Sequence, residues 1–277
     1  MKLIAKILLV LISIPVILMC LLSINIRLQF LSSGFWISAF EKGDVYIKTS
    51  SVIENKLITR VVAEGGKESD VTVLSGLISP SSLKYFFENN IDSLLLFANG
   101  KSPEMMVYVP LTLSDALEGN DYYNLENFSE KMTMTEFLEK FNVIGVNASD
   151  LQMISRLGIW SWAFVAVSFI LLVIIIFLMY RLTQAGKRLV APAVPLILSA
   201  ILIIGASYAG KFGGRVLAEG FTGSPNIGTS LAAIITPPVI RDVAKIWITF
   251  GASLLILGVL LLFIKKPLYN SRIHKPE

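Results

Sequence analysis

The chain has 277 residues, of which 54% are hydrophobic and only 16% are charged. Soluble domains carry about 25% charged residues, so this composition and a mean hydropathy of +0.70 exclude an ordinary soluble protein. The formal net charge is +4, but residues 27–156 hold 17 acidic and 11 basic residues, a net of −6, whereas the rest of the chain holds 3 acidic and 13 basic residues, a net of +10. Because the basic excess lies in the apolar part of the chain, we expect a lipid bilayer and no nucleic acid as partner.

Four apolar stretches have the length of about 20 residues that a helix needs to cross a bilayer. They lie within residues 1–26, 157–180, 190–210 and 243–264. The first begins with Lys2 and Lys6, like a secretion signal, but it is longer than the apolar part of a signal peptide and no small-x-small cleavage site follows it, so we expect an uncleaved anchor. The sequence predicts a mainly α fold, in which a four-transmembrane-helix bundle carries a mostly helical extracytoplasmic domain inserted between the first and second spans.

Basic residues near the ends of the spans predict the orientation, because loops rich in Lys and Arg stay in the cytoplasm. Residues 181–189 form a short link with three basic and no acidic residues, and residues 265–277 form a basic tail. We expect both in the cytoplasm, and residues 27–156 and 211–242 on the other side. The chain is therefore predicted to be a multi-pass protein of the cytoplasmic membrane with both termini in the cytoplasm.

Helical periodicity dominates the acidic region 27–156. The expected elements, in chain order, are helices over 33–43, 44–62 and 79–100, a strand over 105–109 and a short helix over 133–141. Ser79 followed by Pro80 is the clearest helix start, and Thr133 with Glu136 fits a capping box. A second capping box, Ser149 with Gln152, predicts a helix that runs unbroken from 150 to 180 into the second span.

The connection between the third and fourth spans is predicted to be a Gly-rich outer loop, residues 211–242, that contains one short apolar segment, 231–235. Thr236 followed by Pro237 and Pro238 is typical of a helix start, which places the beginning of the fourth helix near Val239. Our hypothesis is that the apolar segment lies either in the membrane interface or against the acidic domain.

Catalytic motifs are absent from the sequence. It contains no phosphate-binding loop, no HExxH and no Cys/His cluster, and a catalytic triad would have to use His274 of the basic tail. We therefore expect neither an enzyme nor a cofactor or metal, and we assign no catalytic residue. Ser207 is the candidate nucleophile of a hydrolase, but the small residues around it favour helix packing, with Ala206, Gly210 and Gly214 at four-residue spacing.

Three classes of function remain after these exclusions. The leading hypothesis is a non-enzymatic membrane protein whose outer domain binds a protein partner or organises the cell envelope. A transport or channel component ranks second, and a homo-oligomer would serve it because the span centres lack ionisable residues. A membrane-bound hydrolase ranks third. The acidic residues Asp115, Glu118 and Asp121 match no calcium loop or glycosidase pair and are interpreted as a solvated surface.

Several short sequence motifs of the acidic region are similar to those of a family of bacterial multi-pass membrane proteins from candidate-phylum and Chloroflexi-like lineages. They are Phe35-Trp36, Gly43-Asp44-Val45-Tyr46, the helix start from Ile78 to Lys84, and Gly100 ahead of residues 107–113. The resemblance implies an extracytoplasmic helical domain and carries over no activity. The order of spans also resembles permease subunits of mechanotransmitting ABC systems, but the chain lacks their amphipathic cytoplasmic helix and their longer inner loop.

Overall fold

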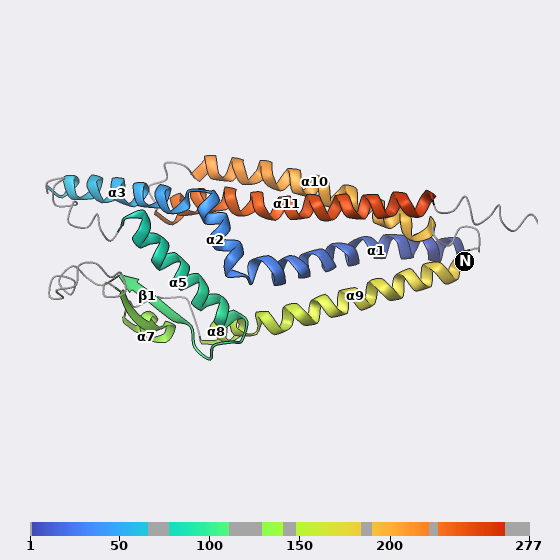
Figure 1. The fold of residues 1–277 in the computed structure, drawn as a ribbon, viewed down its shortest axis with the longest axis horizontal. Coiled ribbons are helices and arrows are strands. Elements are labelled where there is room, and N and C mark those ends of the chain that lie inside the picture. The colour runs from blue at the N-terminus through green and yellow to red at the C-terminus, as the bar shows by residue number, and fades with distance from the viewer. Residues whose placement is uncertain are drawn as a thin grey trace, which may run out of the picture. The chain divides into compact units, whose positions relative to one another are not determined.

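The computed structural model describes residues 2–65, 78–110, 129–140, 148–183, 190–221 and 227–263. The chain divides into two compact units, whose helices and strands are drawn in Figure 1. The first unit comprises Met1–Arg27, Ser161–Gly213 and Ile240–Glu277, and the second comprises Leu28–Trp160 and Gly214–Val239. The described part is mainly helical, as predicted.

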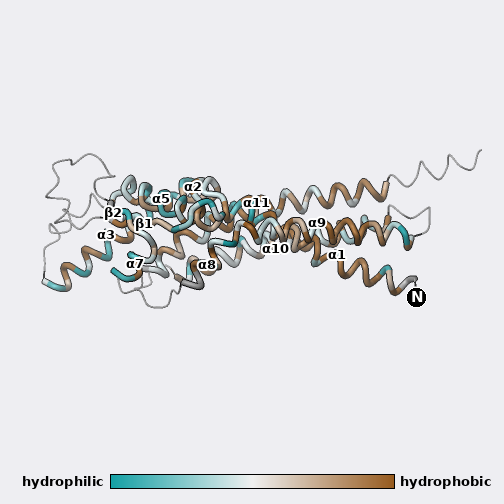
Figure 2. The backbone as a smooth tube through the Cα atoms, turned by 90° about the horizontal axis from the view of Figure 1, so that it is seen from below, coloured by the Kyte–Doolittle hydropathy of each residue, from teal (hydrophilic) through white to brown (hydrophobic). Residues whose placement is uncertain are grey.

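Four helices are long and apolar enough to cross a membrane, which confirms the predicted multi-pass character. They are α1 (Lys2–Asn25), α9 (Leu157–Leu182), α10 (Val190–Phe221) and α11 (Ile227–Phe263). Hydrophobic residues colour most of their length in Figure 2. Many of these apolar side chains are exposed on the protein, as they must be where lipid is the solvent.

All four helices contribute to the core of the first unit. Ile17 and Leu21 of α1 pack with Leu196 and Ile203 of α10, and further contacts come from the other two helices, through Leu172 of α9 and Trp247 of α11. A second cluster joins α1 to α9 through Val16, Ile175 and Met179. The single cysteine, Cys20, is buried.

Helices α10 and α11 approach closely along a seam of small residues. A Cβ atom on Gly251 would lie 3.2 Å from the carbonyl oxygen of Ala200, and one on Gly258 would lie 3.2 Å from that of Ala193. Gly251 and Gly258 are seven residues apart on α11, as Ala200 and Ala193 are on α10. One further step of seven residues along each helix places Ala244 opposite Ser207. All six residues are buried. We call these six residues, Ala193, Ala200, Ser207, Ala244, Gly251 and Gly258, the small-residue seam.

The seam corrects part of the predicted stripe of Ala206, Gly210 and Gly214 on the third span, of which only Gly214 is buried. Ala206 is exposed, and a Cβ atom on Gly210 would have no heavy atom within 4 Å. The physical reason is the period of the contact. A seven-residue repeat follows a left-handed helix crossing, so the buried stripe passes through Ser207 instead of the four-residue stripe beside it.

The single-turn π-helix η1 (Ile26–Phe30) contains the boundary between the two units, and the helices α2 (Ser33–Lys42), α3 (Val45–Ala63) and α5 (Pro80–Ala98) belong to the second unit. The predicted starts of α2, α3 and α5 are confirmed, although the side chain of Asp44 forms no cap hydrogen bond at the start of α3. Ser79 caps α5, because its hydroxyl accepts a hydrogen bond from the backbone N–H of Ser82 at 3.2 Å. Antiparallel strands β1 (Met106–Pro110) and β2 (Ser129–Thr133) follow, then α7 (Met134–Lys140) and α8 (Ala148–Ser155).

An aromatic core holds α2, α3 and α5 together. Phe40 of α2, Tyr46 of α3 and Phe87 of α5 meet edge to face, with ring centroids 6.0 to 6.2 Å apart. Edge-to-face pairs of this kind add roughly 0.5–1.5 kcal/mol to the free energy gained by burial alone. Trp36 extends the cluster, and its indole N–H donates to the carbonyl oxygen of Phe30 at 3.0 Å.

The first half of α11 also belongs to this aromatic core. Ile234, Ile235 and Val239 pack against it, and a Cβ atom on Gly43 would lie 2.7 Å from Cβ and Cγ of Pro238. The predicted contact of the apolar segment 231–235 with the acidic region is therefore confirmed.

Two predictions about element boundaries are wrong. Residues 211–221 and 227–242 are helical instead of forming a loop, and α11 begins before the predicted start near Val239. Ile234 and Ile235 of α11 pack against the aromatic core, which favours helix in the segment that precedes the two prolines. The helix expected over 150–180 is interrupted at Arg156, between α8 and α9. Gly158 lies so close to Asn99 that its Cβ would be 2.7 Å from the Cα of Asn99, and the chain turns to make this approach to the end of α5.

Candidate functional site

Side chains of α5 cap one edge of the two-stranded sheet. The side-chain amide of Asn90 accepts from the backbone N–H of Tyr108 at 2.9 Å and donates to the carbonyl oxygen of the same residue at 2.9 Å. The backbone N–H of Met106 donates to the hydroxyl of Ser93 at 2.8 Å. Asn90 thus bonds to β1 as a neighbouring strand would, and this edge is closed to further pairing.

Among the described residues, no strand pairs with the opposite edge of the sheet, along β2, which we call the open edge. Lys131 stands opposite Tyr108 in the register. Because the backbone groups of Tyr108 bond to Asn90, this pair is of the non-hydrogen-bonded type, and the N–H and C=O of Lys131 also point away from the partner strand. Within the described ranges, neither group has a backbone partner outside the sheet. Glu130 and Lys131 are exposed, whereas the side chain of Met132, the next residue of β2, is only 5% exposed.

Local contacts stiffen the open strand. The capping box predicted at the start of α7 is confirmed, since the backbone N–H of Thr133 donates to Glu136 at 2.7 Å and that of Glu136 donates to the Thr133 hydroxyl at 3.2 Å. These hydrogen bonds from Thr133 lower the pKa of the Glu136 carboxyl. Lys140 pairs with Glu130 at 2.6 Å, and the Lys131 ammonium lies 5.6 Å from the centroid of the Tyr108 ring.

A cluster of polar residues lies at the rim of the aromatic core. The Tyr46 hydroxyl donates to Glu88 at 3.3 Å, and Lys84 pairs with Glu41 at 2.6 Å and with Glu88 at 3.7 Å. Burial raises the pKa of the Tyr46 phenol, and the charge of Glu88 raises it further. A hydrogen bond to Glu41 raises the pKa of Lys84. Both shifts favour the protonated forms of Tyr46 and Lys84 near neutral pH.

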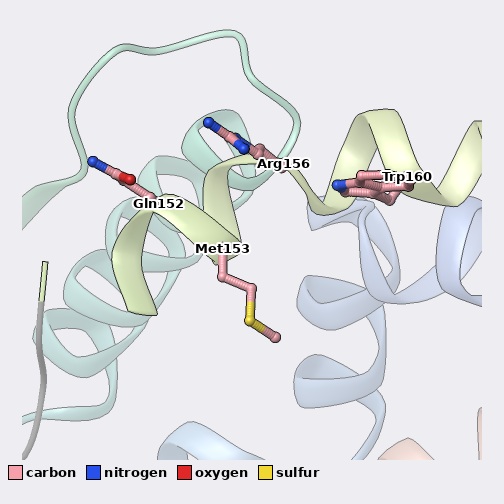
Figure 3. A pocket seen from close by; sticks show the side chains of 4 residues that line it. All are labelled: Gln152, Met153, Arg156 and Trp160. Atoms are coloured by element: carbon pink, nitrogen blue, oxygen red, sulfur yellow. The ribbon is translucent and has the colours of Figure 1, made fainter. Parts of the chain in front are cut away.

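A small cavity of about 240 Å³ lies where α8 meets α9, lined by Gln152, Met153, Arg156 and Trp160 (Figure 3). Gln152 and Arg156 extend to the same side of the chain, whereas Met153 points the other way. The backbone N–H of Trp160 donates to the carbonyl oxygen of Arg156 at 3.0 Å, which fixes the spacing of the two side chains. This cavity combines one positive charge, one amide and two large apolar groups.

The first unit contains three buried polar groups without a hydrogen-bond partner among the residues described. They are both amide atoms of Asn25, the hydroxyl of Ser199 and the indole N–H of Trp247. Asn25 is 2% exposed and Ser199 is fully buried. By contrast, the hydroxyl of Ser207 donates to the carbonyl oxygen of Ile203 in its own helix at 2.7 Å.

The structure therefore gives Ser207 a place in the small-residue seam and no catalytic partner among the residues it describes. Asp115, Glu118, Asp121 and His274 lie outside the described residues, as do most of the link 181–189 and the tail 265–277. Sequence reasoning missed Asn90, Lys131 and the cavity at Arg156. Gln152 was noted only as part of a capping box, and the tryptophan that follows Arg156 by four residues was the one signal for the cavity.

Comparison of the chain with protein-family models, curated proteins and solved structures finds no match. The family resemblance drawn from the sequence motifs stays a prediction.

Proposed function

We propose that the chain is a non-enzymatic integral membrane protein whose second unit lies outside the cytoplasm and binds a protein partner through strand β2. The observation that supports this proposal is the asymmetry of the two-stranded sheet. One edge is closed by Asn90 and Ser93, and the other presents the outward backbone groups of Lys131. An extended segment of a partner chain would add to this edge as a third strand.

The two-stranded sheet is already held in the conformation that pairing with a third strand requires. Its closed edge is fixed to α5 by three hydrogen bonds, and its open strand is fixed at Thr133 and Glu130, so little conformational entropy is lost when a partner strand pairs with it. Exposed edges invite aggregation unless charges interrupt them. Glu130 and Lys131 place one negative and one positive side chain on the open strand, which favours a specific partner over unselective pairing.

A proline substitution tests the open edge directly. Lys131→Pro removes the outward N–H without removing a bond to β1, and Lys131→Ala is the matched control that loses the charge but keeps the N–H. We expect partner capture by crosslinking in native membranes to be lost in the proline variant and retained in the alanine variant. Equal capture by both variants, or a wild-type chain that remains a solitary monomer, would contradict the proposal.

A second candidate function, transport, is favoured by the unpaired polar groups of the first unit. A buried polar atom without a partner costs several kcal/mol in a membrane interior, and a polar group retained there is a candidate for contact with a polar solute. Single-channel current across a planar bilayer that contains the purified protein, reduced by Asn25→Leu, would support this candidate. A bilayer that stays sealed would remove it.

A further inference from the structure

The cavity at Arg156 lies next to the membrane by its position in the chain. The candidate span on α9 begins at Leu157, one residue after Arg156. Any residue that directly precedes a span lies at the level of the lipid headgroups, where Trp and Arg side chains are commonly found. A phospholipid is therefore the class of ligand that this position favours.

The charge of the cavity is unbalanced. Arg156 is exposed and forms no ion pair with the acidic residues that the structure describes. Its guanidinium extends to the same side as the side-chain amide of Gln152 (Figure 3). A guanidinium binds the two free oxygens of a phosphodiester through two parallel hydrogen bonds, and an amide adds a donor for a third contact or an acceptor for a headgroup hydroxyl.

The apolar side of the cavity matches the rest of a lipid. Met153 is 71% exposed and Trp160 is 57% exposed, which is unfavourable in water for side chains of this size. Both become favourable where the glycerol backbone and the first methylene groups of a lipid cover them. The polar and apolar halves of the cavity thus correspond to the polar and apolar parts of one molecule.

We propose that this cavity is a binding site for an anionic phospholipid, with the phosphodiester on Arg156 and Gln152 and the start of the acyl chains on Met153 and Trp160. An anionic headgroup such as phosphatidylglycerol leaves the phosphate charge uncompensated for Arg156, whereas the ammonium of a zwitterionic headgroup competes with it. The site requires only that α9 spans the membrane, and it is independent of partner binding at β2.

Binding is tested on the full-length protein in detergent micelles with short-chain lipids. Native mass spectrometry counts bound dioctanoyl-phosphatidylglycerol and dioctanoyl-phosphatidylcholine over a concentration series. We expect the wild type to prefer the anionic lipid and Arg156→Gln to bind it roughly tenfold more weakly, as loss of one charge-assisted contact predicts. Arg156→Lys should fall between them, because it keeps the charge but loses the paired hydrogen bonds.

The matched control is Arg60→Gln. Arg60 is an exposed arginine of α3, paired with Glu64 at 3.0 Å, and its substitution removes the same charge at a distance from the cavity. It should bind the anionic lipid as the wild type does. Equal loss in both variants would show unselective attraction and overturn the proposal, as would unchanged binding in Arg156→Gln. Equally tight binding of soluble glycerol 3-phosphate would assign the site to a free phosphate compound and would also overturn it.

Discussion

Both polar atoms of the Asn90 amide form hydrogen bonds with strand β1. Substitution of Asn90 therefore measures what this contact contributes to stability. Asn90→Ala leaves the N–H and C=O of Tyr108 without their partner and should lower the free energy of unfolding by about 1–3 kcal/mol. Asn89 is the control, because among the described residues its amide bonds to Tyr85 in its own helix and not to β1. Thermal unfolding in detergent micelles measures both variants, and an equal loss in the two would show that the contact with β1 adds nothing.

Tyr46 should make stability depend on alkaline pH. Burial raises the pKa of its phenol, so the folded protein holds the proton more tightly than the unfolded chain, in which the pKa is about 10. The stabilising contribution is complete below about pH 10 and is lost as the pH rises towards the folded-state pKa. Tyr46→Phe should therefore lose stability less steeply than the wild type above pH 10, as measured by denaturant unfolding. Parallel pH profiles would argue against a buried, protonated phenol.

Residue roles that depend on neighbours in the chain could be predicted from the sequence, and roles that depend on the fold could not. The cap at Ser79 and the box at Thr133 and Glu136 require only three or four consecutive residues, and both are present. Asn90 acts only because β1 lies beside α5. The sequence around it shows an ordinary helix, and nothing in its spacing to Tyr108 indicates the contact.

At the scale of elements, the small-residue seam makes a sharp prediction about two glycines. Gly251→Leu forces a side chain into the space occupied by Ile204 and the Ala200 carbonyl, which should cost about 1–3 kcal/mol through overpacking. Gly205→Leu is the control, because a Cβ atom there has no heavy atom within 4 Å. Resistance to denaturation in detergent should fall only in the first variant. A similar fall in both would contradict close packing at the seam.

The existence of the helices was easier to predict than their extent. Hydropathy identifies α1, α9, α10 and α11 because lipid requires a long apolar stretch. The continuation of α10 to Phe221 and the start of α11 at Ile227 were not predicted, because Gly-rich and Pro-containing segments are weak helix formers. In α11, Ile234 and Ile235 contact residues that lie far along the chain, which hydropathy does not reveal. The turn at Arg156 was missed for the same reason, since it depends on the position of Asn99.

At the scale of the whole molecule, the proposed orientation predicts which side of the membrane each region occupies. Glu54 is exposed on α3 and Arg181 is exposed at the end of α9. In intact cells, a membrane-impermeant maleimide should label Glu54→Cys but not Arg181→Cys, and permeabilisation should expose the second site. The native Cys20 is buried and should stay unlabelled. The reverse pattern would place residues 27–156 in the cytoplasm.

The small-residue seam also has a consequence for biosynthesis. The third and fourth spans are less apolar than the first two, and each places glycine or alanine where a lipid-facing helix would carry a large side chain. Either helix alone would leave a groove that acyl chains fill poorly, so the two should leave the translocon together as a hairpin. A nascent chain that ends after α10 should therefore be retained at the translocon or degraded, although its last helix is long enough to insert.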